Sequence, residues 1–282
     1  METLQFTTTI KAPASKVWET LWNDTTYRQW TSAFHAGSYA VSEWKEGDPI
    51  QFLATDGGGM YSVIEKKIPN EFMSFRHIGE VKNFEEQPLT EETNGWSGSH
   101  ENYSLEESNG ETILNVYLDS MSEFAAYFSK AFPPALELIK DISEGTIKPS
   151  ITIEATVNAP IEKVWDYWTN PEHVIHWTNA SDDWHAPRAT NDLRTGGKFF
   201  TRMEAKDGSM GFDFEGSYSN VQDNNVIEYD LADDRHIKVT FTQQENGVRV
   251  IETFDPENEN PHEMQRFGWQ AILNNFKKYT EQ

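Results

Sequence analysis

TIEATVNAPIEKVW, residues 152–165, is the stretch that decides the fold, and Asn170-Pro171-Glu172 and His176-Trp177-Thr178 follow it. An alternating Thr-rich run, an Ala-Pro break and an amphipathic run predict a strand, a tight turn and two short helices. Residues 8–18 read TTIKAPASKVW, and Trp30 follows. The tryptophans keep one offset, since 165 − 18 = 147 and 177 − 30 = 147. A repeat of this length has the size of a domain, so the pattern predicts a duplicated domain.

The duplication predicts two domains of ordinary size within 282 residues. Residues 144–150, EGTIKPS, contain Gly145 and Pro149 and are typical of a linker. We therefore expect domains at residues 1–144 and 151–282, each with its own apolar core.

Composition excludes several classes of protein. The chain has no cysteine, which excludes disulfides and thiolate metal sites and favours a cytoplasmic location. No export signal and no apolar run of about 18 residues is present, so we expect a soluble chain without membrane insertion. The net charge of −23 disfavours nucleic acid as a partner. Nothing in the sequence indicates the oligomeric state.

Several antiparallel strands and a long final helix are expected to follow the opening elements of each copy. Asn109-Gly110, between two alternating runs, is a strong hairpin signal. In the first copy's last helix, Pro133-Pro134 predicts a kink or break near Phe132, which would bend the helix over or into the cavity. The first copy has 13 more residues than the second between matching turns (150 − 137, from Met60/Met210 and Asn109/Asn246). We expect residues 79–94 to form a protruding, mobile loop there.

The order of these elements, opening on Ala-Pro-x-x-x-Val-Trp, resembles the START-like helix-grip (SRPBCC) superfamily. It is most similar to bacterial relatives of the C-terminal domain of the activator of heat-shock-protein-90 ATPase. The residues that carry the resemblance are those of 159–165 with Pro171-Glu172, Trp177-Thr178, Gly196-Gly197-Lys198-Phe199 and Asp207-Gly208, and 12–18 with Trp30. The resemblance implies an α+β fold of two tandem helix-grip domains, each a curved antiparallel β-sheet wrapped around a long C-terminal α-helix. It also implies a cavity between sheet and helix that holds an apolar small molecule in many members.

A metal site is the alternative interpretation of His173-x-x-His176 with Asp182, Asp183 and His185. We favour a polar helix face beside a buried Trp177 and expect no metal or other cofactor. Gly57-Gly58-Gly59 lacks a following Lys-Ser/Thr and is expected to be a turn.

Binding of a hydrophobic small molecule or lipid is the favoured function, because aromatic residues are abundant and no catalytic constellation is visible. We expect the second copy to be the better binder and the first copy to be filled by its own side chains. A cyclase- or hydrolase-type enzyme is the alternative. It requires a buried acid or base that faces the cavity, which His185, Asp213 or Glu215 would provide if strand alternation turns it inward. A third alternative is a stress-response protein that contacts a chaperone. The candidate ligand-binding residues are Trp177, Phe199, Phe212, Phe214, Tyr229, Trp269 and Phe276 in the second copy, and Trp30, Phe52, Tyr61, Phe75, Phe128 and Phe132 in the first.

Overall fold

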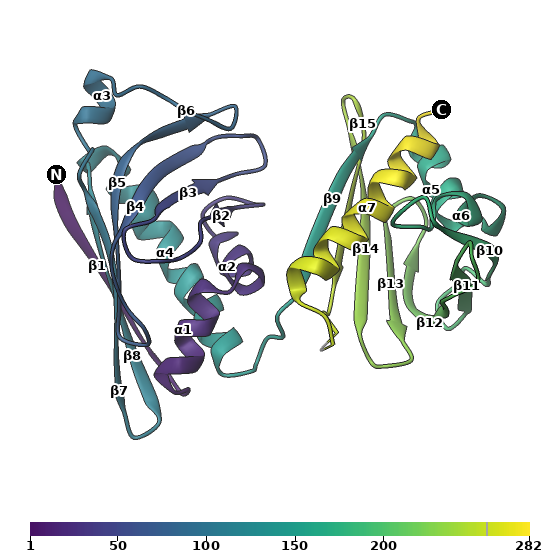
Figure 1. Ribbon diagram of the computed structural model, residues 1–282, viewed down its shortest axis with the longest axis horizontal. Helices are drawn as coiled ribbons and strands as arrows, with labels where there is room; N and C mark the ends of the chain where they lie inside the picture. Colours follow the sequence, from purple (N-terminus) through teal and green to yellow (C-terminus); the bar gives the residue numbers. More distant parts are fainter. Residues whose placement is uncertain (258) are drawn as a thin grey trace. The chain divides into compact units, whose positions relative to one another are not determined.

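The computed structural model describes residues 1–257 and 259–282 and divides into two compact units, Met1–Pro149 and Ser150–Gln282 (Figure 1). Each unit is an antiparallel sheet with a long C-terminal helix against it and two short helices after its first strand. This is the α+β helix-grip architecture expected from the resemblance. Among the described residues, no helix is both long and apolar enough to cross a membrane.

The sheet of the first unit has the order β1-β8-β7-β5-β4-β3-β2, with β6 pairing β5. The first strand therefore pairs with the last, and the other strands follow as a meander. Its strands are β1 (Glu2–Ile10), β2 (Tyr39–Val41), β3 (Pro49–Leu53), β4 (Gly59–Ile68), β5 (Phe72–Lys82), β6 (Glu85–Glu86), β7 (His100–Ser108) and β8 (Glu111–Ser120). Its helices are α1 (Ala14–Trp22), α2 (Asp24–Thr31), α3 (Glu91–Asn94) and α4 (Ser122–Ser143). Asn109 and Gly110 join β7 to β8 with positive φ angles of 55° and 80°, which confirms the hairpin expected there.

The sheet of the second unit repeats this plan in the order β10-β11-β12-β13-β14-β15-β9. Its strands are β9 (Ile151–Val157), β10 (Trp184–Asn191), β11 (Lys198–Ala205), β12 (Gly211–Gln222), β13 (Val226–Leu231), β14 (His236–Gln244) and β15 (Gly247–Phe254). Its helices are α5 (Ile161–Thr169), α6 (Pro171–Trp177) and α7 (His262–Thr280). Pro160 precedes the first turn of α5, and Asn170 caps α6 by accepting a hydrogen bond from the Glu172 N–H.

Helix α4 runs without interruption from Ser122 to Ser143, so of the kink or break expected near Phe132 the break does not occur. Pro133 and Pro134 lack the N–H groups that would bond to the carbonyls of Ser129 and Lys130. Both prolines lie on the exposed face, where water can reach these carbonyls. The opposite face buries Phe132 among the other core residues of α4, and this packing holds the helix together.

The extra segment of the first copy is folded, which corrects the expectation of a loop at residues 79–94. Strand β5 continues through Gly79 to Lys82 and pairs with β6. Helix α3 follows and has a capping box, in which Thr90 and Thr93 satisfy each other's backbone N–H groups. The additional residues thus include β6, α3 and the turns that join them to the sheet.

We predict that residues 1–149 and 150–282 fold independently, because each unit encloses its own buried core. Expressed separately, each fragment is expected to be soluble and to unfold cooperatively, and their circular dichroism spectra are expected to sum to that of the full chain. Fragments that lack a cooperative transition would contradict this prediction.

Candidate functional site

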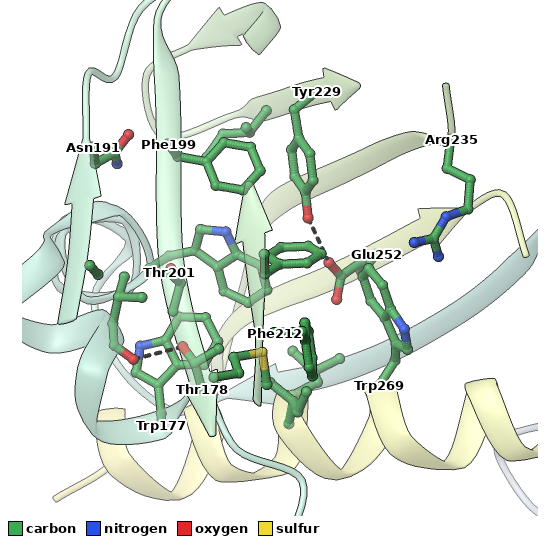
Figure 2. A pocket seen from close by; sticks show the side chains of 18 of the residues that line it. Trp177, Thr178, Asn191, Phe199, Thr201, Phe212, Tyr229, Arg235, Glu252 and Trp269 are labelled. Atoms are coloured by element: carbon green, nitrogen blue, oxygen red, sulfur yellow. Dashed lines mark hydrogen bonds between the residues drawn. The ribbon is translucent and has the colours of Figure 1, made fainter. Parts of the chain in front are cut away.

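A cavity of about 880 Å³ lies in the second unit between the inner face of the sheet and helix α7 (Figure 2). Aromatic side chains from α5, α6, β11, β12, β13 and α7 dominate its wall. They are Trp168, Trp177, Phe199, Phe212, Phe214, Tyr218, Tyr229 and Trp269. Its size and lining are those of a small-molecule site.

Strand alternation directs these rings inward. Phe199 and Thr201 on β11 are two positions apart and line the cavity, as do Phe212 and Phe214 on β12. The Phe199 ring packs edge-on against Tyr229 at 4.9 Å, and Phe214 meets Trp269 at 5.9 Å. The sheet and the helix thus contribute to one continuous aromatic surface.

Six of the seven candidate residues in the second copy line the cavity: Trp177, Phe199, Phe212, Phe214, Tyr229 and Trp269. Phe276 lies behind the wall and is fully buried. Its ring centroid is 4.8 Å from that of Trp168 and 5.0 Å from that of Trp177. Phe276 faces the short helices α5 and α6 and packs behind two rings of the cavity wall, so it supports the wall without lining the cavity.

The candidate residues of the first copy lie in or against its core. Trp30, Phe75 and Phe132 are buried, and Phe52 and Phe128 pack against this cluster. Phe132 stacks on Phe6 at 4.4 Å, and Phe52 meets Phe75 at 5.2 Å. Tyr61 is half-buried, and its hydroxyl donates to the Gln87 carbonyl at 3.4 Å.

The two interiors differ at two matching positions. The rings of Trp22 and Tyr103 meet at 5.1 Å inside the first unit, and the Trp22 ring also contacts Trp44 and Phe75. Trp22 corresponds to Thr169 at the constant offset (169 − 22 = 147). Tyr103 pairs with Val116 as Val239 pairs with Glu252, so Tyr103 corresponds to Val239. The second unit therefore has smaller side chains at these two positions, although neither Thr169 nor Val239 is among the residues that line its cavity.

A buried carboxyl group, Glu252, lines the same cavity from β15 and is 6% exposed. The Tyr229 hydroxyl donates to Glu252 Oε1 at 3.4 Å (Figure 2). Burial raises the pKa of the Glu252 carboxyl from 4.5 to about 8, and the Tyr229 hydrogen bond only partly opposes this rise. Burial and the adjacent Glu252 raise the pKa of the Tyr229 hydroxyl as well. At neutral pH the carboxyl is therefore mostly protonated.

Glu252 is specific to the second unit. It pairs with Ile153 on β9, as Val116 pairs with Phe6 on β1, and Phe6 and Ile153 match at the offset of 147 (153 − 6). The first unit therefore has a buried valine at the equivalent position, so the fold itself does not require a carboxyl there.

The sequence analysis missed Glu252, although β15 carries a signal for it. Val248, Val250 and Phe254 are buried and share one face of the strand with Glu252. A glutamate that interrupts an alternating apolar face is the pattern that points to a buried acid.

His185, Asp213 and Glu215, the acids and bases suggested by the sequence, do not line the cavity. His185 Nε2 lies 3.3 Å from Glu204, and Asp213 pairs with Arg202 at 3.0 Å. Glu215 is exposed on the opposite face of β12 from Phe214. The inward orientation that the enzyme alternative requires of them is therefore not found: Phe212 and Phe214 take the inward-facing positions of β12, and His185 on β10 contacts Glu204.

His173 and His176 pack against aromatic rings. His173 stacks on Tyr167 at 3.8 Å, and its Nδ1 lies 2.9 Å from the Tyr279 hydroxyl; His176 stacks on Tyr279 at 5.5 Å. Within the part of the chain that the structure describes, no group of three or more His, Asp or Glu side chains is arranged to hold a metal ion.

Charged side chains gather at the end of the cavity beyond Glu252. Asp233, Arg235, Glu257 and Glu259 line this end. The Arg235 Nε donates to Asp233 at 2.7 Å, so the guanidinium already has a carboxylate partner. The cavity is thus aromatic along its length and acidic at one end.

Comparison with known proteins places these features in context. The family model described as Activator of Hsp90 ATPase homolog 1-like protein (AHSA1) matches residues 158–281. The AHSA1-like protein from Aeromonas hydrophila is 42% identical over 47% of this chain and 92% of that chain, with a TM-score of 0.45. Chr148 from Cytophaga hutchinsonii is 54% identical over the same shares, with a TM-score of 0.43.

Similarity over the full length is more distant. The di-domain ARO/CYC protein BexL from the BE-7585A biosynthetic pathway covers 100% of this chain and 98% of its own. It is 13% identical, with a TM-score of 0.41. Among curated proteins, none matches this sequence significantly.

We predict that the stability of the second unit falls as pH rises from 4.5 to 8. In this window the folded state keeps a proton on Glu252 that the unfolded state has released, so the free energy of unfolding decreases. The slope reaches at most about 1.4 kcal/mol per pH unit. Glu252→Gln removes this dependence, and urea unfolding of both proteins at pH 5 to 9 measures it. Parallel stability curves for wild type and variant would refute the prediction, and Glu215→Gln, an exposed change of equal charge, is the control.

Proposed function

The chain belongs to the AHSA1-like family, and from this premise we propose that its second domain binds a hydrophobic small molecule or lipid in the cavity between sheet and helix. The observation that carries the proposal is the aromatic cavity of about 880 Å³. Aromatic walls supply much apolar contact area at a small cost in side-chain entropy. A cytoplasmic location, expected from the cysteine-free composition, belongs to the same proposal.

The difference between the two copies supports placing the ligand in the second domain. The candidate residues of the first copy lie in or against its core, whereas six of the seven in the second copy line the cavity.

A proton-transfer enzyme of cyclase or hydrolase type is the second candidate. Glu252 favours it, because a carboxyl whose pKa lies near 8 inside an aromatic cavity is poised for acid–base chemistry at neutral pH. Hydrolysis of a 4-nitrophenyl ester of an aromatic acid tests the hydrolase form. A rate that rises with pH through about 8 in wild type and is lost in Glu252→Gln would support it.

A chaperone contact is the remaining alternative. Its supporting observation is the pair Met264 and Phe267, which are exposed one turn apart on α7. Binding of the chain to a purified chaperone, compared between wild type and Phe267→Ala, tests it.

The ligand-binding proposal predicts that an apolar fluorophore such as 1-anilinonaphthalene-8-sulfonate, or its uncharged analogue N-phenyl-1-naphthylamine, binds with a change in tryptophan emission. Because Trp269 borders the cavity, Trp269→Phe is expected to lose much of this signal. Phe212→Ala removes a half-exposed ring from the wall, and we expect binding to weaken roughly threefold to tenfold.

Phe267→Ala is the matched control, because Phe267 is 78% exposed and lies outside the cavity. It is expected to leave the affinity unchanged. Absence of binding, or binding that Trp30→Phe in the first copy alters and Phe212→Ala does not, would overturn the proposal.

A further inference from the structure

Building on the proposed function, we propose that the ligand is an apolar amine whose ammonium group is held at Glu252, with its apolar body along the aromatic wall. Glu252 directs its carboxyl toward Tyr229 at the acidic end of the cavity (Figure 2). This deepens the binding proposal by naming a chemical class of ligand.

The charged residues that line the cavity favour one sign of charge on the ligand. Among the described lining residues, Asp233, Glu252, Glu257 and Glu259 are acids, and Arg235 is the one basic side chain. Because Arg235 is paired with Asp233, its charge is largely neutralised. The chain as a whole carries a net charge of −23. An anionic ligand is repelled at this end and a cation is attracted.

The geometry of Glu252 supplies an anchor for such a cation. Its carboxyl is buried, and among the described residues only the Tyr229 hydroxyl hydrogen-bonds to it, at a long 3.4 Å. An ammonium group can donate to the same carboxyl, which converts a poorly satisfied buried acid into a charge-assisted pair. The rings of Tyr229, Phe214 and Trp269 present faces and edges nearby, and aromatic faces attract cations.

Binding of an ammonium group at Glu252 is expected to release the carboxyl proton. Burial keeps the carboxyl protonated in the empty cavity, as its pKa of about 8 indicates. A bound ammonium favours the ionised form, so the carboxyl proton leaves to solvent as the ion pair forms. Tyr229 from β13 hydrogen-bonds to Glu252, and Arg235 from the β13–β14 turn lines the same end of the cavity (Figure 2). The Tyr229 hydroxyl keeps its proton, because its pKa is raised well above 10.

Three ligands with one body and different head groups test the proposal: 2-(1-naphthyl)ethylamine, 2-(1-naphthyl)ethanol and 1-naphthylacetic acid. Isothermal titration calorimetry of the full chain at pH 7, in phosphate and in Tris, measures affinity and proton release together. We expect the amine to bind roughly tenfold more tightly than the alcohol. The acid is expected to bind most weakly. Only the amine is expected to show a buffer-dependent heat that reports proton release.

Glu252→Gln keeps the side chain's size and removes its charge. It is expected to abolish the preference for the amine over the alcohol and to abolish proton release. Glu215→Gln makes the same change of charge on the exposed face of β12 and is expected to keep the preference for the amine.

The outcomes separate the two proposals. Equal affinities for all three ligands, or amine binding without proton release in wild type, would overturn the amine assignment and leave the binding function standing. If neither these ligands nor the fluorophores bind, the proposed function itself fails. A cooperative urea transition shows that Glu252→Gln is folded, and if that transition is lost, the wild-type proton release alone decides.

Discussion

The packing of a curved sheet against one long helix is the constraint on which the rest of this structure depends. The first and last strands pair, β1 with β8 and β9 with β15, and this pairing closes each meander beside its helix. A single helix covers only part of the inner sheet face. The uncovered volume must be filled by side chains, occupied by a ligand, or left open at a cost in stability.

The two copies resolve this constraint differently. The first copy buries Trp22, at the end of α1, and Tyr103, on β7, in the core between its sheet and its helices. The second has Thr169 and Val239 at these positions and encloses a cavity. The two copies thus share one scaffold and differ in the side chains that fill its interior.

Glu252 is the second departure from a simple apolar core. Replacing a buried valine by a glutamate costs stability, because an ionised carboxyl loses its hydration and a protonated one needs hydrogen-bond partners. Tyr229 supplies one long hydrogen bond. A costly buried group on a cavity wall is consistent with a site in which a ligand supplies the missing partner.

The sequence by itself determined the duplication, the order of elements, the Asn109-Gly110 hairpin and most of the aromatic residues of the second cavity, because turn chemistry and periodicity are local properties. Only the tertiary structure decided that α4 continues through Pro133-Pro134, that Phe276 lies behind the cavity wall and that Asp213 and Glu215 face away from it. It also decided which residues line the cavity of the second unit. These outcomes depend on strand phase and on the fit of side-chain volumes from elements far apart in the chain, such as Trp22 and Tyr103, and no local pattern contains that fit.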